Sequence, residues 1–197
     1  SGATYMDGTT DITRTYPLGE LTEDERKFYT WTLQCHIDIA KAVWLDYCDC
    51  HMIDTIAREP LWRHLINYRC GTGHSVSFVG NVHEGPHALN GRNTTLMRPG
   101  MIVTDEPGVY ETDLVGIRIE NELVCVHKAD NQYGTFLGFE PIMFVPIATS
   151  PIVPGVLTKD ELDWLNNYHR QVFEKLAPRL NDEEREWLAK KCAAIGC

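Results

Sequence analysis

Two acidic residues on either side of a Pro-Gly pair constrain the fold of this chain more than any other feature. From Asp105 to Asn121 the sequence reads Asp-Glu-Pro-Gly-Val-Tyr-Glu-Thr-Asp-Leu-Val-Gly-Ile-Arg-Ile-Glu-Asn. If the segments on the two sides of a Pro-Gly turn pair as antiparallel strands, Glu106 and Glu120 come together. Because side chains alternate along a strand, Arg118 and Glu120 are expected on the same face.

Two upstream motifs add further candidate metal ligands. They read Asp-Gly-Thr-Thr-Asp11-Ile-Thr-Arg and Gly-Thr-Gly-His74. With Glu106 and Glu120 they offer three carboxylates and one imidazole, a set that suits Mn²⁺, Co²⁺ or Zn²⁺. Such ions activate water near neutral pH, so hydrolysis is the first functional hypothesis. The alternative for Glu120, taken alone, is an exposed acid at a strand edge.

Charge and cysteine content narrow the class of protein. A net charge of −10 and a pI of about 5.2 argue against nucleic acid and anionic membranes as partners, since both require a basic face. No run approaches the ~20 apolar residues of a membrane span. The seven cysteines are irregularly spaced, which predicts reduced thiols and a soluble, cytoplasmic protein. Cys48-Asp-Cys50-His51 is interpreted as a loop with free thiols rather than a zinc site.

Periodicity and capping signals predict the order of elements. Two capping boxes, Thr22 to Glu25 and Thr158 to Glu161, predict helix starts. The first of these helices is expected to reach about Trp44. The other expected elements are strands at 3–6, 11–16, 101–103, 116–126 and 142–145, helices at 51–58 (ended by Pro60), 61–66 and 182–193, and an active-surface loop region at 71–100.

Loop histidines and one arginine are candidate substrate contacts. His83 and His87 flank a Glu-Gly-Pro sequence, and a histidine near a metal centre can donate a proton to a leaving amine. Loop histidines are common, and His87 carries the weaker signal. Arg118 is more often a salt-bridged surface group, but beside an acidic metal cluster it would anchor a carboxylate or peptide carbonyl.

The motifs together resemble a known family. Asp-Gly-Thr-Thr-Asp-Ile-Thr-Arg, Gly-Thr-Gly-His, Asn-Val-His-Glu-Gly-Pro, Glu-Pro-Gly and Gly-Ile-Arg-Ile-Glu-Asn occur in this order, as in Xaa-Pro aminopeptidases (aminopeptidase P). The resemblance implies part of an α+β pita-bread fold, a curved antiparallel sheet flanked by helices. Residues 1–150 would form the C-terminal portion of its catalytic domain, and 151–197 a helical C-terminal extension.

The same resemblance implies roles for individual residues. Asp11 and Glu120 would be bridging ligands, His74 the imidazole ligand, and Glu106 a ligand that also acts as general base. His83 would act in catalysis and substrate binding. The further substrate contacts expected are Arg118, His87 and Cys70. The full-length active site would hold two divalent metals, Mn²⁺ foremost with Co²⁺ or Zn²⁺ as alternatives, and would act on peptides with a penultimate proline.

The chain also departs from the family pattern. Cys70 stands where a histidine is expected, Ser75 and Ser77 where glycines are, and Val109 where a tyrosine is. One more aspartate ligand is expected directly before the first residue, so the chain is expected to be an inactive piece of a larger protein. Alternatives are a prolidase-type dipeptidase, a methionine aminopeptidase, or a non-catalytic interaction module. A homodimer is predicted from the apolar side chains of the tail helices, namely Trp164, Leu165, Phe173 and Trp187.

Overall fold

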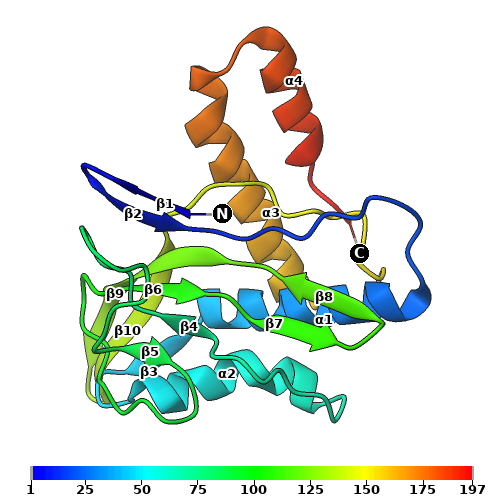
Figure 1. Ribbon diagram of the computed structural model, residues 1–197. Coiled ribbons are helices and arrows are strands. Elements are labelled where there is room, and N and C mark those ends of the chain that lie inside the picture. Colours follow the sequence, from blue (N-terminus) through cyan, green and yellow to red (C-terminus); the bar gives the residue numbers. More distant parts are fainter. Residues whose placement is uncertain (1, 197) are drawn as a thin grey trace.

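A four-stranded antiparallel sheet forms the centre of the molecule. The computed structural model describes residues 2–196. The sheet has the order β3 (Val43–Leu45), β10 (Gly134–Pro141), β9 (Asn121–Asn131), β6 (Ile102–Asp105). Figure 1 shows helices α1 (Glu23–Ala40) and α2 (Cys50–Trp62) along the lower side of the strands, and hairpin β1–β2 along the upper side. The expected α+β class is confirmed.

Three small two-stranded sheets accompany the central one and carry three of the candidate site residues, namely Asp11, His74 and Arg118. These sheets are β1 (Gly2–Tyr5) with β2 (Gly8–Asp11), β4 (Gly73–His74) with β5 (Ala88–Leu89), and β7 (Gly108–Glu111) with β8 (Val115–Arg118). The expected antiparallel pairing around Glu106 and Glu120 is confirmed, because Asp105 pairs with Asn121 and Gly108 with Arg118. The chain does not reverse at Pro107-Gly108, however. It turns after Glu111, where Leu114 N donates to the Glu111 carbonyl.

The helices begin where the capping signals predict. Thr22 caps α1, and its backbone N–H donates to the Glu25 carboxylate at 2.7 Å. Thr158 and Asn181 cap α3 (Lys159–Leu176) and α4 (Asp182–Lys191) in the same way, with the 3₁₀ turn η1 (Ala177–Arg179) between them. Both C-terminal helices are thus confirmed. Figure 1 shows them as a helical hairpin that projects away from the sheet.

Two predicted helix ends are wrong. The first helix ends at Ala40, and Trp44 lies instead on β3, where its ring packs 4.5 Å from that of Phe139 and the backbone pairs with β10. Pro60 does not end the second helix but sits in its last turn. A proline removes one backbone hydrogen bond from a helix, and only Leu61 and Trp62 of α2 follow it here; Pro60 and Leu61 are both buried. The separate helix at 61–66 is therefore absent from the described chain.

Two predicted strands are also misplaced. Residues 12–16 are irregular, and the Thr13 carbonyl accepts from the Glu120 N–H and from Arg14 Nη1. Residues 142–145 are irregular too, since the strand β10 that precedes them ends at Pro141. β7 and β10 were not predicted as separate strands, and the expected strand at 116–126 is divided between β8 and β9 at Ile119 and Glu120.

The tail helices pack on the body of the molecule. Leu165, Tyr168 and Val172 of α3 join Leu33 and Ile37 of α1 in one buried cluster. Of the four side chains behind the homodimer hypothesis, Leu165 is fully buried, Trp164 and Phe173 are partly buried, and Trp187 is 56 % exposed. Three of the four apolar side chains that suggested a dimer are therefore buried, wholly or partly, by contacts within the chain. Dimerisation stays a prediction that a mass measurement would test.

The described cysteines are free thiols, and they lie in several different elements of the fold. Cys35, Cys48, Cys50, Cys70, Cys125 and Cys192 carry free thiols, and Cys197 lies outside the described residues. Cys50 is not in a loop as expected, because Asp49 caps α2 and Cys50 is the first residue of that helix. Across residues 2–196, no helix combines the length and apolar character needed to cross a bilayer.

Candidate metal centre

Three predicted ligands converge from segments that lie far apart in the sequence. Asp11 ends β2, His74 ends β4, and Glu120 lies between β8 and β9. Each offers one ligand atom, and these atoms all lie within 4.8 Å of one another. His74 Nε2 is 3.6 Å from Asp11 Oδ2. The spacing is that of side chains that can share one cation.

The fourth predicted ligand, Glu106, adjoins this cluster. Its Oε1 lies 3.0 Å from His74 Nε2 and accepts a hydrogen bond from Thr104 Oγ1 at 3.1 Å. Its Oε2 forms an ion pair with Arg118. Arg118 in turn donates from Nε to the Tyr110 hydroxyl at 2.7 Å. The guanidinium group of Arg118 thus places a positive charge beside the acidic cluster.

Two buried polar atoms show that the cluster fits a metal ion. His74 Nδ1 lies 3.1 Å from the Ser75 carbonyl, which requires a proton on Nδ1 and leaves the Nε2 lone pair facing the carboxylates. Within residues 2–196, His74 Nε2 and Glu120 Oε1 are buried and make no hydrogen bond. Buried polar atoms rarely lack a partner, and these two are ligand atoms of the types that Mn²⁺ and Zn²⁺ accept.

Local electrostatics favour a bound cation. Burial raises the pKa of Glu120, and the Thr13 hydroxyl that donates to its Oε2 opposes that shift. Burial raises the pKa of Glu122 as well, while Glu122 Oε1 accepts the Asp11 backbone N–H at 2.6 Å. Several carboxylates therefore share a poorly solvated volume with few positive charges. A divalent ion would relieve their mutual repulsion.

The backbone around His74 fixes this arrangement. His74 N donates to Thr104 Oγ1 at 2.9 Å, and Glu106 N donates to the Thr72 carbonyl at 2.6 Å. Thr72 is itself held by the buried side chains of Asp54 and Tyr68. Both ligand-bearing segments are thus tied to α2 through Asp54.

The predicted pocket histidines occupy different environments. The His83 ring lies 4.1 Å from the His74 ring in an edge-on arrangement, and the residue is exposed. His87 is buried, and its Nε2 lies 2.7 Å from the Ile102 carbonyl. The structure thus brings His83 to the cluster and gives His87 a backbone contact. Substrate binding by either histidine stays a prediction.

The positions that depart from the family pattern lie in different surroundings. Cys70 is half-buried, and its Sγ donates to the Gly108 carbonyl at 3.4 Å. Val109 is fully buried with Cys35 and Leu61. Ser75 is buried and bonded through its backbone to His87 and Glu84, whereas Ser77 lies in the loop that follows. A substrate contact by Cys70 is likewise still a prediction.

Sequence reasoning missed several residues that support the ligands, chiefly Thr13, Arg14, Thr104 and Glu122. Thr13 and Thr104 carried a usable signal, because each lies two residues from a predicted ligand, Asp11 or Glu106, and would share its face on an extended chain. Arg14 and Glu122 contact the site through pairings between distant segments. Those pairings become visible only in the folded chain.

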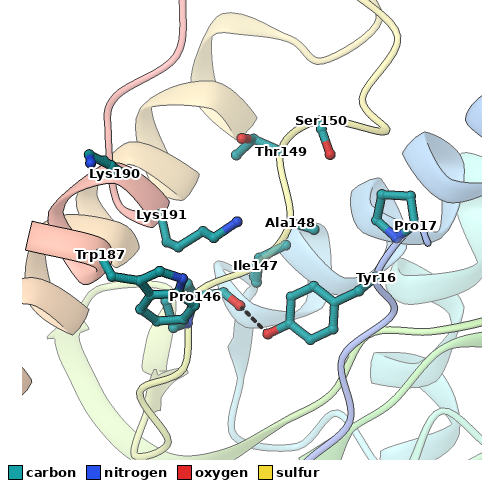
Figure 2. Close-up of a pocket in the computed structure, with 10 residues that line it drawn as sticks. All are labelled: Tyr16, Pro17, Pro146, Ile147, Ala148, Thr149, Ser150, Trp187, Lys190 and Lys191. Carbon is teal, nitrogen blue, oxygen red and sulfur yellow. Dashed lines mark hydrogen bonds between the residues drawn. The ribbon is translucent and has the colours of Figure 1, made fainter. Parts of the chain in front are cut away.

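A separate hollow of about 340 Å³ lies between α4 and residues 146–150. Figure 2 shows Trp187 and Lys191 on one side of it and Tyr16 on the other. None of the predicted ligands or substrate contacts lines this hollow. It is therefore distinct from the candidate metal centre.

Comparison with known proteins agrees with this geometry. Residues 1–127 match metallopeptidase family M24, and residues 135–195 match the C-terminal region of peptidase M24. Aminopeptidase P1 of Lotus japonicus is 43 % identical over 203 aligned positions, covering 100 % of this chain but 30 % of the relative. The chain thus spans about a third of the length of such relatives.

Solved structures show the same likeness. An X-prolyl aminopeptidase from Caenorhabditis elegans, described as a cytosolic enzyme with a di-nuclear active site, matches with a TM-score of 0.91 and 37 % identity over 98 % of this chain and 32 % of that one. The prolidase of Pyrococcus furiosus matches with a TM-score of 0.60 and 27 % identity over 71 % of this chain and 38 % of that one. The pita-bread fold expected from the sequence is confirmed.

Proposed function

The chain belongs to metallopeptidase family M24, and from this membership we propose that the protein containing it is a metal-dependent aminopeptidase that releases an N-terminal residue from peptides with a penultimate proline. The convergence of Asp11, His74 and Glu120, with Glu106 beside them, is the observation that carries the proposal. The likeness to aminopeptidase P proteins supports the proline specificity. The likeness to a cytosolic enzyme supports the cytoplasmic location.

The ligand chemistry supports divalent metal ions, with Mn²⁺ proposed first and Co²⁺ or Zn²⁺ as alternatives. Carboxylates suit Mn²⁺, whereas imidazole also accepts Zn²⁺ and Co²⁺. Asp11, His74, Glu106 and Glu120 would hold the metal in this chain. When bound, divalent metals in such sites supply water activation and polarisation of the scissile carbonyl. The di-nuclear site of the nematode enzyme supports two metals per complete site.

The chain's own residues would position the peptide and move the proton. Glu106 would accept a proton on a carboxylate oxygen, with Arg118 and Thr104 fixing that carboxylate. His83, exposed beside His74, would donate a proton to the leaving amine and bind the substrate. Arg118 would anchor a peptide carbonyl. Contacts by His87 and Cys70 are proposed as secondary, since His87 is buried.

A glutamine substitution tests the metal site in the whole protein. Glu120→Gln keeps the shape of the side chain but removes the charge, so metal content by elemental analysis should fall by about 10-fold or more. Glu174→Gln on the exposed face of α3 is the matched control and should retain wild-type metal. Unchanged metal content in Glu120→Gln would contradict the assignment.

Substrate length separates the proposed activity from its alternatives. The wild-type protein should cleave the Arg-Pro bond of Arg-Pro-Pro and leave the dipeptide Ala-Pro intact. Cleavage of Ala-Pro in preference to the tripeptide would instead indicate a prolidase. If the wild-type protein binds no metal and cleaves neither peptide, the result would support a non-catalytic interaction module.

A further inference from the structure

A row of buried polar side chains lies beneath the two glutamate ligands. Asp105 immediately precedes Glu106, and Asn121 immediately follows Glu120. Asp105, Asn121 and His36 are 0 % exposed, and Tyr168 is 1 % exposed. Four buried polar residues from β6, β9, α1 and α3 thus meet directly behind the metal centre.

Close polar contacts join these residues in one continuous chain. His36 Nδ1 lies 3.3 Å from the Asp105 backbone carbonyl oxygen and 2.9 Å from Asp105 Oδ2, and His36 Nε2 lies 3.3 Å from Asn121 Nδ2. Asn121 Oδ1 accepts from Arg14 Nη2 at 2.8 Å and lies 3.1 Å from the Tyr168 hydroxyl oxygen, which is equally close to the carbonyls of Met143 and Val145. An arginine can only donate, so the Asn121 oxygen must face Arg14 and its amide nitrogen must face His36. His36 is therefore protonated on Nδ1 and accepts on Nε2.

Arg14 and Tyr168 extend this chain to the ligand-bearing backbone. Arg14 donates to the Glu120 carbonyl and, at 2.9 Å, to the Thr13 carbonyl. It also donates to the carbonyls of Val145 and Pro146, which belong to the segment that precedes α3. Figure 2 shows the Tyr16 hydroxyl directed at the same Pro146 carbonyl, 3.5 Å away. Residues 13–16 and 145–146 are thus fixed to each other and to Glu120.

We propose that Tyr168 and His36 are positioning residues for the metal centre, because the hydrogen-bonded chain Tyr168–Asn121–His36–Asp105 sets the separation of Glu106 and Glu120. This inference rests on the proposed metal-dependent function. It assigns helix α3 of the C-terminal region a role in the metal site, although no residue of α3 belongs to the ligand cluster.

The physical reason is that these groups are buried away from water. With exposures of 0–1 %, water cannot replace a lost hydrogen bond, so the remaining groups must shift to find partners. Asn121 and Asp105 are covalently adjacent to Glu120 and Glu106, so their shifts move the ligands. Metal sites respond strongly to such outer contacts, typically by 10–100-fold in affinity for ~1 lost partner.

Tyr168→Phe tests the proposal in the whole protein, because it removes one oxygen and preserves the ring packing. We expect the dissociation constant for Mn²⁺ to rise about 10-fold. The visible absorption spectrum of the Co²⁺-loaded protein should also change, since it reports ligand geometry. The matched control is Tyr29→Phe, which removes a hydroxyl that donates to the Ala148 carbonyl at 2.7 Å. This control should leave affinity and spectrum unchanged.

The outcomes separate this inference from the function on which it rests. Wild-type metal affinity and spectrum in Tyr168→Phe would overturn the positioning role, even if the wild-type protein is an active metalloenzyme. A wild-type protein that binds no metal would overturn the proposed function instead. An equal loss of affinity in Tyr29→Phe and Tyr168→Phe would mean a general packing effect and would also overturn the positioning role.

A second pair of variants decides the matter if Tyr168→Phe does not fold. His36→Ala removes both hydrogen bonds of the imidazole, whereas His36→Asn keeps a donor nitrogen close to the position of Nδ1. We expect His36→Asn to recover part of the Mn²⁺ affinity that His36→Ala loses. If the two variants bind Mn²⁺ equally weakly, the bond to Asp105 does not position the ligands.

Discussion

Gly73 determines where the imidazole ligand lies. A Cβ atom built on Gly73 would stand 1.7 Å from the Thr104 carbonyl oxygen, well inside any allowed contact. The two backbones can approach this closely only because Gly73 has no side chain. The same approach lets Thr104 Oγ1 accept the His74 N–H.

Gly73→Ala should therefore displace β4 and weaken the metal site. The obstacle is backbone rather than a flexible side chain, so we expect a loss of about 1–3 kcal/mol in unfolding free energy together with reduced Mn²⁺ affinity. Gly91→Ala is the matched control, because its Cβ would meet no atom within 4 Å. Equal Mn²⁺ affinity in the two variants, measured by titration, would contradict this role of Gly73.

At the residue scale, ligand identity was easier to predict than ligand support. Asp11, His74, Glu106 and Glu120 stand in compact motifs, so the family resemblance proposes them as ligands, and the structure brings them together. Arg14 and Glu122 act through hydrogen bonds to Glu120 and Asp11, each more than 100 residues away. No local pattern marks a partner that distant.

The joint between helix α3 and the segment before it contains a titratable group. His169 is 0 % exposed, and its Nε2 accepts the Ile147 N–H at 3.1 Å. Burial, together with the smaller effect of the positive charge of Arg14, lowers the pKa of His169 to about 4. The folded protein thus favours the neutral imidazole, which keeps its hydrogen bond to Ile147.

This shift predicts a loss of stability in acid. A histidine whose folded pKa is below its unfolded value of 6.5 contributes stability above pH 6.5, and that contribution is lost as pH falls from 6.5 towards 4. At pH 5 the loss is about 2 kcal/mol. We therefore expect His169→Gln, which keeps an acceptor but cannot titrate, to lose less thermal stability than wild type between pH 7.5 and 5.

The measurement is thermal unfolding of the whole protein in a metal chelator, so that acid-induced metal loss does not contribute. His127→Gln on the exposed part of β9 is the control, and its pH dependence should follow wild type. Parallel curves for wild type and His169→Gln would show that His169 is not the responsible group.

Among the elements, starts were predicted better than ends. Capping boxes are local signals, and both Thr22 and Thr158 open helices as expected. The end of α1 depends instead on Trp44 finding a strand partner in Leu137, about 90 residues later. Pro60 was predicted to end the second helix, but it is buried in the last turn of α2, which continues to Trp62. Tertiary contacts determine where these helices end, so the periodicity of the sequence alone could not predict their last residues.

Considered as a whole, the molecule exposes apolar side chains next to the metal centre. Hairpin β1–β2 and the loop at 78–79 present Tyr5, Met6, Phe78 and Val79, which are between 61 % and 91 % exposed. A groove of about 510 Å³ runs between them and reaches Glu122, the residue that holds the Asp11 backbone. Exposed apolar surface of this kind commonly marks a contact region. Since the relatives are about three times as long, we expect further parts of the whole protein to cover it.

The isolated 197-residue chain should accordingly be a poor catalyst. Two metals normally act together in such sites, one assisting the attacking water and the other the carbonyl, and the ligands found here suffice for one tightly held ion. An open groove also positions a peptide less well, which raises the barrier further.

We expect the chain, assayed with excess Mn²⁺ on Arg-Pro-Pro, to bind at most one metal and to show less than about 1 % of the whole protein's turnover. The same chain carrying Glu120→Gln gives the background from contaminating peptidases. Turnover near that of the whole protein, absent from the Glu120→Gln chain, would mean that residues 1–197 already contain a complete site.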